Sequence, residues 1–458
     1  MILSEIFERF VKRSPASVMA RALMEHALAP DAVDALFAEH TERQYTRELL
    51  FSSVVNLMAM VVTKVQPSIH AAFQAVKKDL PVSVVALYNK INRTEAGIVR
   101  VLVRHTAERL AKVIAAMGGM MPSLLPGFPV RIIDGNHLAA TERRLEVLRG
   151  SIAGPLPGHA LVVLDPELML ATHMIPCEDG HAQERSLTDQ ILGLVVAGEV
   201  WIADRNFCTI ALLTGIDQRQ AFYVVRQHAN LPIVSAGSMR MRGRTDTGEV
   251  WEQSVTIARA GGERLQARRI VIKLDTPTRD GDTEMAILTN LSANVADAPV
   301  VASLYRKRWT LETMFQSLTR MLQGEIAALG YPKAALLGFG VALAAFNIMS
   351  TVEAALRANF GAENVQENVS GYYIANEIRG TLPGMTIVLD PETWESYQTM
   401  PPKALAREML RWSKHVDLAT FKKHRRGPKT PVPKRTRFPD KTHVSTARLL
   451  AESRKRSR

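Results

Sequence analysis

The 458-residue sequence contains only two cysteines, Cys177 and Cys208, and this scarcity excludes several classes of protein. Two cysteines cannot form a disulfide framework or a cysteine-based zinc site, and they suit a reducing cytosol. The sequence also lacks a phosphate-binding glycine loop, an HExxH zinc motif and a GxSxG nucleophile with partners. Neither an internal repeat nor a low-complexity core is present, so the composition is that of an ordinary globular protein.

Long hydrophobic runs are also few. The first thirteen residues carry charges within their apolar stretch, so we expect no secretory signal. The run 334–352 is uncharged and borderline in length for a membrane span, but it includes glycine, asparagine, serine and threonine. No aromatic belt or basic flank accompanies it. We expect a helix buried in the core of a large domain, with a membrane span as the alternative.

Charge of one sign is concentrated at one end of the chain. The net charge is +12, and residues 421–458 contain 14 Lys or Arg against two acids, so this segment accounts for the whole excess. Such an arm seeks polyanions, and nucleic acid is the expected partner. No amphipathic helix or lipidation motif accompanies the charge, which argues against a membrane surface. The segment also combines basic residues with proline, so we expect it to be disordered in isolation, although residues 443–456 could form a short helix when bound.

The first 125 residues have the periodicity of helices. A long amphipathic segment, 97–117, ends at a pair of glycines. Residues 68–78 and 82–92 predict two helices joined by a tight turn. This pair could be a DNA-reading helix-turn-helix, although an ordinary helical hairpin explains the pattern as well.

The pattern changes after the proline- and glycine-rich stretch 121–129. Short runs of β-branched residues predict strands, one ending in Ile-Asp-Gly at Asp134 and another in Ala-Asp-Arg-Asn-Phe at Asp204. Strands followed by a helix and a further strand predict a mixed α/β domain. Residues 212–295 are β-rich and are interpreted as an insertion between the strand of Asp204 and the helix of Glu312. Helices resume at about residue 298.

Three carboxylates are the candidate catalytic residues. A carboxylate at the end of a buried strand is held rigidly, as a metal ligand must be, although turn aspartates are common there for structural reasons. A predicted helix over 305–320 places Tyr305, Arg308 and Glu312 on one stripe. A guanidinium there can grip a phosphate while the acid binds metal, and the structural alternative is a solvated Arg–Glu pair.

These residues resemble the DDE transposases of the bacterial IS4 type. The Ile-Asp-Gly and Asp-Arg-x-Phe motifs and the run Tyr-x2-Arg-x3-Glu carry the resemblance, which covers roughly residues 130–350. The family normally has a lysine seven residues after the glutamate, where this chain has Thr319 followed by Arg320. We expect Arg320 to supply the missing cation.

The resemblance implies an RNase H-like core interrupted by the β-rich insertion. It also implies that Asp134, Asp204 and Glu312 bind two Mg²⁺ ions, for which Mn²⁺ can substitute, and that the ions drive phosphoryl transfer on DNA. The partners would be the inverted repeats at transposon ends and target DNA, held by a homodimer formed on DNA. The protein would act in the bacterial cytoplasm, at the nucleoid.

Further residues are candidate DNA contacts. Trp251 could stack on an unpaired base, although packing within the insertion explains it better. The acids Glu178, Asp179 and Glu184 lie in a polar loop and are expected to be solvated. Basic residues complete the predicted DNA-binding set, which consists of Tyr305, Arg308, Arg320, Arg205, Trp251, Lys422, Lys423, Arg425 and Arg426.

The sequence therefore predicts four parts. These are a helical N-terminal domain (1–125) that could bind DNA ends, an RNase H-like catalytic domain (126–350), a helical region (351–420) and the basic tail (421–458). The predicted activity is cut-and-paste transposition. Two alternatives stay open at this point: a DNA-binding protein that has lost catalysis, and a metal-dependent nuclease or resolvase that cuts without joining.

Overall fold

The computed structural model describes most of the chain, namely residues 5–42, 48–78, 80, 82–139, 145–149, 153–258, 264–278, 281–424 and 443–456. The predicted DNA contacts Arg425 and Arg426 lie outside these ranges.

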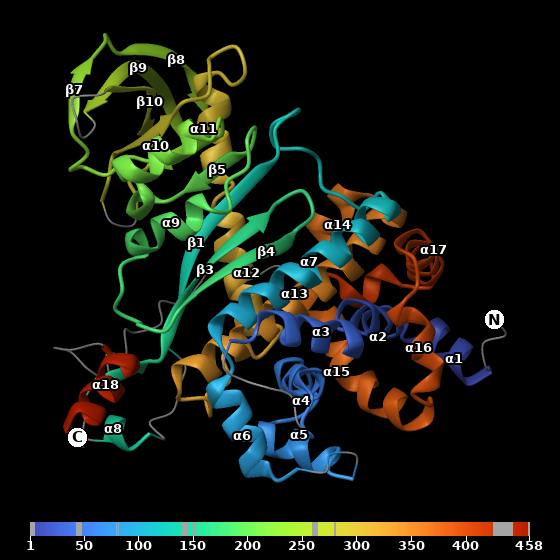
Figure 1. Ribbon diagram of the computed structural model, residues 1–458. Helices are drawn as coiled ribbons and strands as arrows, with labels where there is room; N and C mark the ends of the chain where they lie inside the picture. The colour runs from blue at the N-terminus through green and yellow to red at the C-terminus, as the bar shows by residue number, and fades with distance from the viewer. Residues whose placement is uncertain are drawn as a thin grey trace.

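The predicted N-terminal helices are confirmed and share one core with helices from the C-terminal half (Figure 1). Ser68 and Ser83 cap the two helices of the predicted hairpin, and Gly118, at φ +69°, ends the long helix that follows. The helices are α1 (Glu5–Arg13), α2 (Pro15–Ala27), α3 (Pro30–His40), α4 (Phe51–Val62), α5 (Ile69–Ala75), α6 (Val84–Arg93) and α7 (Ala96–Met117).

A mixed sheet forms the centre of the molecule. Its first five strands in space are ordered β4-β3-β1-β5-β6. The β1 strand pairs antiparallel with β3 and parallel with β5, and β5 pairs parallel with β6. Their bounds are β1 (Val130–Leu138), β3 (Gly158–Asp165), β4 (Leu170–Cys177), β5 (Val200–Ala203) and β6 (Phe222–Arg226).

The β-rich insertion extends this sheet instead of forming a separate one, because β11 pairs antiparallel with β6. The curled strands lie at the upper left of Figure 1. The predicted start at 212 is too early, since α10 (Ile210–Gln218) and the core strand β6 come first. The inserted strands are β7 (Ile233–Ala236), β8 (Arg240–Thr245), β9 (Gly248–Ala258), β10 (Arg264–Leu274) and β11 (Glu284–Thr289).

Helices cover both faces of the sheet. The larger core lies between one face of the sheet and the helices of the N-terminal and C-terminal regions, which we call the helical body. It contains Ile132 and Ile202. The second core lies on the opposite face, beneath η1 (Glu184–Leu187), α9 (Thr188–Leu192) and α10, and contains Ile133 and Trp201. The helix that the sequence predicts before the strand of Asp204 is short, because η1 and α9 together end at Leu192.

The apolar run 334–352 lies within α13 (Pro332–Phe360). This helix is long and apolar enough to cross a membrane, but 94% of its most apolar window is buried inside the protein. Its polar Asn347 is also explained: the side-chain amide accepts from the backbone N–H of Ala171 on β4 (2.8 Å) and donates to the Ala171 carbonyl (2.9 Å). The prediction of a buried core helix is confirmed.

The remaining helices complete the helical body or surround the site. Those before α13 are α11 (Ala298–Arg306) and α12 (Trp309–Arg320), and those after it are α14 (Ala362–Asn368), α15 (Gly371–Val388), α16 (Glu392–Gln398) and α17 (Pro402–Ser413).

The end of the basic tail is ordered, in contrast to the expectation for the whole tail. Strand β12 (His443–Ser445) pairs in parallel with β2 (Gly154–Leu156), and α18 (Thr446–Arg456) packs near α8 (Glu146–Arg149). The Asp179 carboxylate accepts hydrogen bonds from Ser445 (2.6 Å) and Arg448 (2.8 Å). These contacts hold this part of the tail against the body of the protein.

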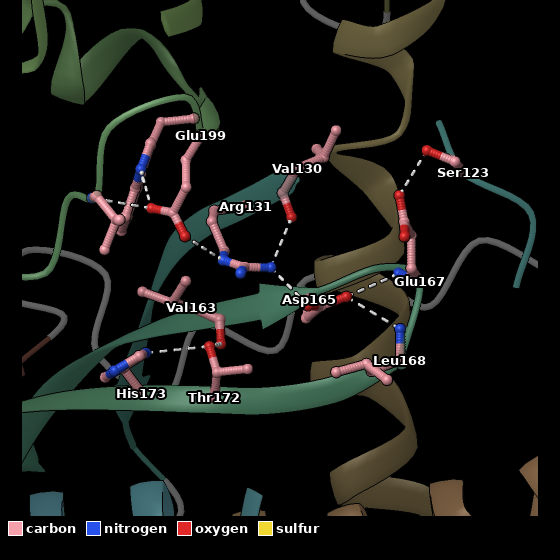
Figure 2. Close-up of polar contacts among 12 residues, drawn as sticks. Ser123, Val130, Arg131, Val163, Asp165, Glu167, Leu168, Thr172, His173 and Glu199 are labelled. Atoms are coloured by element: carbon pink, nitrogen blue, oxygen red, sulfur yellow. Dashed lines mark hydrogen bonds and ion pairs between the residues drawn. The ribbon is translucent and has the colours of Figure 1, made fainter. Parts of the chain in front are cut away.

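Buried ion pairs tie β1 to its two neighbours at its first residues (Figure 2). We call Arg131, Asp165 and Glu199 the Arg131 network. The Arg131 guanidinium donates to Asp165 (2.5 Å) at the end of β3 and to Glu199 (2.9 Å) just before β5. The network thereby fixes the three strands on which the candidate site is built.

Candidate active site

The two predicted aspartates lie side by side because of the strand register. Ile132 of β1 pairs with Ile202 of the parallel strand β5, and the ladder ends there. Asp134 and Asp204 each follow two residues later, so they occupy equivalent positions where the strands separate. Alternation along a strand puts both side chains on the sheet face of Ile132 and Ile202.

The sequence predicted that Asp134 ends its strand, but the structure places it within the strand. The β1 strand continues to Leu138, paired with β3, and Asp134 is opposite Val162. The opening next to Asp134 arises because β5 stops at Ala203. The strand that carries the first aspartate is therefore longer than its apolar run suggested, since polar residues can pair at a sheet edge.

Local backbone amides hold each aspartate in place. Asp134 Oδ1 accepts from the backbone N–H of Gly135 (2.8 Å). Asp204 caps the short helix η2 (Arg205–Phe207) and accepts from the N–H of Asn206 (2.8 Å). In each carboxylate, the second oxygen takes no part in this backbone hydrogen bond.

Helix α12 brings the third carboxylate to the aspartates. Arg308 pairs with Asp134 (Nη1 to Oδ2, 2.7 Å) and with Glu312 (Nη2 to Oε1, 2.5 Å). The structure therefore unites Asp134, Arg308 and Glu312, which are far apart in the sequence. Tyr305 adds a buried hydroxyl beside Arg308, and burial raises the pKa of that hydroxyl.

The helix bearing these residues is interrupted, whereas a continuous helix was predicted. The chain leaves α11 at Arg306 and enters α12 at Trp309. Between them, Arg308 donates its backbone N–H to the Tyr305 carbonyl (3.0 Å), a tighter 3₁₀-type bond. This tight turn does not displace Arg308 and Glu312, which still face Asp134.

Like charges accumulate around Asp134. Burial, with smaller contributions from the neighbouring Asp204 and Glu312, raises the pKa of Asp134 to about 6 against the opposing effect of Arg308. A group of acids that share one arginine is electrostatically unbalanced. Such a group favours an additional cation.

A fourth acid belongs to this group, and the sequence prediction missed it. Glu184 was expected to be solvated, but burial raises its pKa to about 7, with Asp204 as the next contribution. Its Oε2 accepts from the side chain of Asn206 (3.2 Å). A Cβ on Gly135 would overlap Glu184 Oε1, so the missing side chain at Gly135 is the signal that could have indicated this contact. We call Asp134, Glu184, Asp204 and Glu312 the carboxylate cluster.

The other predicted DNA contacts are placed as follows. Arg205 and Arg320 are exposed, as is Thr319, at the position of the missing lysine. The Lys64 ammonium donates to the Arg320 carbonyl (3.1 Å) and so brings a second cation to this end of α12.

Trp251 is half-buried in the insertion. Its indole N–H donates to Glu249 (3.2 Å), and the Lys273 ammonium lies 4.3 Å from the ring centroid. Trp309, at the start of α12, is by contrast 60% exposed.

Lys422 and Lys423 are exposed at the end of the helical body. Lys423 donates to the carbonyl of Gln366.

The donor chemistry of the carboxylate cluster fits a hard divalent cation, because every ligand oxygen is a carboxylate oxygen. In the described part of the chain, no three His, Cys, Asp or Glu side chains are yet arranged to hold one metal ion. The Arg308 guanidinium lies between Asp134 and Glu312. Its Nε is buried without a hydrogen-bond partner among the described residues, which leaves a donor for a substrate oxygen.

The fold and the site thus define a mixed α/β domain with carboxylates gathered where two parallel strands separate. Residues 127–346 match the protein family described as "Transposase DDE domain". This range includes Asp134, Glu184, Asp204 and Glu312.

A relative from Sinorhizobium fredii (strain NBRC 101917 / NGR234), named "Putative transposase y4zB", is 27% identical over 147 residues. The alignment covers 31% of this chain and 39% of the relative, so this chain matches less than half of the relative's length.

Proposed function

We propose that this protein is a transposase that cuts DNA at the ends of a mobile element and joins the freed ends to target DNA. One observation carries the proposal. Arg308 binds both Asp134 and Glu312, and strand register puts Asp204 next to Asp134. Three acids from distant parts of the sequence are therefore neighbours, within the range that matches the transposase DDE domain.

An RNase H-like core of the IS4 type is the fold that we propose for residues 126–350. The strand order β4-β3-β1-β5-β6, with β1 antiparallel to β3 and parallel to β5, supports it. The position of the insertion supports it as well, because in the sequence β7–β11 lie between the strand before Asp204 and the helix of Glu312.

Asp134, Asp204 and Glu312 would hold two divalent ions, Mg²⁺ or, as a substitute, Mn²⁺. When bound, such ions activate the attacking oxygen and stabilise the leaving oxygen of a phosphodiester. The protein contributes rigid positions: Asp134 is fixed by the sheet and Asp204 by its cap. The Arg308 guanidinium, whose Nε has no hydrogen-bond partner among the described residues, would bind a phosphate oxygen of the DNA.

A basic groove supports double-stranded DNA as the partner. A groove of about 750 Å³ lies between α6 and α18, with four cations and two acids, Glu95 and Glu178, on its walls. The cations are Lys90, Arg93, Lys333 and Arg454. Because α6 is the second helix of the predicted helix-turn-helix, we propose this face for DNA ends. Pairing of two ends requires a homodimer on DNA, and we place the protein at the bacterial nucleoid.

The direct test is a cleavage assay with purified protein, DNA that carries the sequences flanking the gene, and Mg²⁺ or Mn²⁺. We expect nicked or excised ends followed by joined products. Asp204→Asn and Glu312→Gln should each abolish cleavage while end binding persists. The exposed acid Asp189 provides a matched control, Asp189→Asn, which should cleave normally. Normal cleavage by Asp204→Asn or Glu312→Gln would disprove the site assignment.

The same assay distinguishes two other functions. Thr319 in place of the family's lysine favours a DNA-binding protein without catalysis, and that protein would bind the ends without cutting them. A nuclease or resolvase would cut without joining.

The role of the tail has a separate test. Replacing Lys422, Lys423, Arg425 and Arg426 by glutamine should weaken binding to every DNA sequence. The slope of log affinity against log salt should flatten by up to roughly 0.9 for each lost phosphate contact. An unchanged slope would exclude these residues from the DNA interface.

A further inference from the structure

Glu184 reaches the two aspartates from the opposite face of the sheet. Asp134 and Asp204 point to the face that α12 covers, whereas Gly135 has the opposite orientation on β1. Glu184 begins the short helix η1, whose Leu187 is buried in the core on that second face. The absent side chain of Gly135 leaves the space through which the Glu184 carboxylate approaches β1.

The loop before Glu184 is held by its own contacts. Asp179 accepts from the backbone N–H of His181 (3.0 Å) and also from two side chains near the C-terminus, Ser445 and Arg448. Gly180 lies against Leu156, where a Cβ would come within 2.7 Å of the Leu156 Cβ. A loop fixed at these points presents Glu184 in a defined position.

Glu184 is tied to the same turn as Asp204. Its Oε2 accepts from the Asn206 side chain (3.2 Å), while the Asn206 backbone N–H donates to Asp204 (2.8 Å). Among the described residues no cation pairs with Glu184, although Asp134 and Asp204 are its charged neighbours. A half-buried acid near two others, with only an amide partner, lacks a counter-ion.

We propose that Glu184 is a fourth carboxylate of the metal site and binds a divalent ion together with Asp134 and Asp204. This inference rests on the proposed function, since it adds a ligand to the metal site described there. It also explains Gly135: any side chain at that position would displace the Glu184 carboxylate from the ion.

The test is Mn²⁺ binding by the full-length protein without DNA, measured by calorimetry and by electron paramagnetic resonance of free Mn²⁺. Glu184→Gln keeps the size of the side chain and can still accept from Asn206, but it removes the charge. We expect its Mn²⁺ affinity to fall by about tenfold or more. Asp189→Asn is the control and should bind as the unmodified protein does, and thermal unfolding should show that both variants are folded.

Asp134→Asn separates a failure of this inference from a failure of the proposed function. If Asp134→Asn loses Mn²⁺ and Glu184→Gln binds it normally, Glu184 is not a ligand, and the three-carboxylate site stands. If neither substitution changes binding, both the inference and the proposed metal site are wrong.

Gly135→Ala tests the placement of Glu184 independently. The added methyl group meets the flexible end of the Glu184 side chain, so folding should persist while Mn²⁺ affinity falls. In a Glu184→Ala background, Gly135→Ala should have no further effect on Mn²⁺ affinity. An equal additional loss there would show that Gly135 acts without Glu184 and would overturn the inference.

Discussion

The β1 strand carries two clusters in which an arginine lies between two acids, and the clusters differ in how their charges are balanced. In the Arg131 network, Asp165 also accepts from the backbone N–H groups of Glu167 and Leu168, each at 2.9 Å (Figure 2). Glu199 also accepts from the N–H of Val196 (3.1 Å) and the Trp201 indole (3.0 Å). Every carboxylate oxygen there has a partner.

The carboxylate cluster begins at Asp134, three residues after Arg131 on the same strand, and it contains more acids than cations. Arg308 forms ion pairs with Asp134 and Glu312, but Asp204 and Glu184 add two more acids. A satisfied network holds strands together, whereas an excess of acids lowers stability until a cation arrives. We infer that the first cluster maintains the fold and the second performs the chemistry.

The largest expected difference is between the two arginines. Arg131→Leu leaves Asp165 and Glu199 buried without their cation, so the free energy of unfolding should fall by about 3–5 kcal/mol. Arg308→Leu should cost less, because Glu312 is more exposed and can be hydrated. Urea unfolding of both variants checks this. Equal losses would mean that both clusters are structural.

Divalent ions should stabilise the protein through the carboxylate cluster alone. With free Mn²⁺ at about 100 times its Kd, binding should add about 2.7 kcal/mol to the free energy of unfolding. Asp204→Asn should remove this gain in stability. Arg131→Leu should retain it in those protein molecules that fold. Thermal unfolding with and without Mn²⁺ gives the measurement. A gain that survives in Asp204→Asn would place the ion elsewhere.

The same substitution should have opposite effects in the two clusters at pH 8 without metal. Asp165→Asn weakens the bond to Arg131 and should destabilise by about 2 kcal/mol. Asp134→Asn removes one of several like charges and should stabilise by about 1 kcal/mol.

The pH dependence of that effect follows from the raised pKa of Asp134. A carboxyl whose folded pKa is about 6 binds its proton more tightly in the folded state than in the unfolded state. Its ionisation therefore lowers stability as pH rises from about 4 to about 6. The benefit of Asp134→Asn should be full at pH 8 and absent near pH 4. A benefit that does not vary with pH would contradict the charge explanation.

The smallest expected effect lies at the edge of the Arg131 network. Ser123 is exposed and donates to Glu167 (2.7 Å), which does not contact Arg131. Ser123→Ala should change stability by only about 0.5 kcal/mol, measured by urea unfolding. A loss as large as that of Asp165→Asn would mean that the network extends to the surface.

Local patterns in the sequence predicted much of this arrangement. Apolar runs that end in acids located Asp134 and Asp204, and helical spacing paired Arg308 with Glu312. The buried helix α13 was predicted because glycine and polar residues interrupt its apolar run. These features depend on neighbouring residues along the chain, which is why a single sequence reveals them.

Features that depend on distant contacts were not predictable. Glu184 looked like a solvated loop acid, because its burial depends on Gly135 and Asn206, which lie in other elements. The order of the tail segment 443–456 was not predicted, because its partners, among them β2 and Asp179, lie far from it in the sequence. The break between α11 and α12 arises from a local tightening that residue spacing does not encode.

The most direct test of the two-cluster account maps the position of the bound ion. Fe²⁺ would replace Mg²⁺, and ascorbate with peroxide would generate hydroxyl radicals that cut the polypeptide beside the ion. We predict fragments that end near Asp134, Glu184, Asp204 and Glu312, and their loss in Asp204→Asn. Cuts near Asp165 and Glu199, or cuts that persist in Asp204→Asn, would contradict the assignment of metal chemistry to the carboxylate cluster.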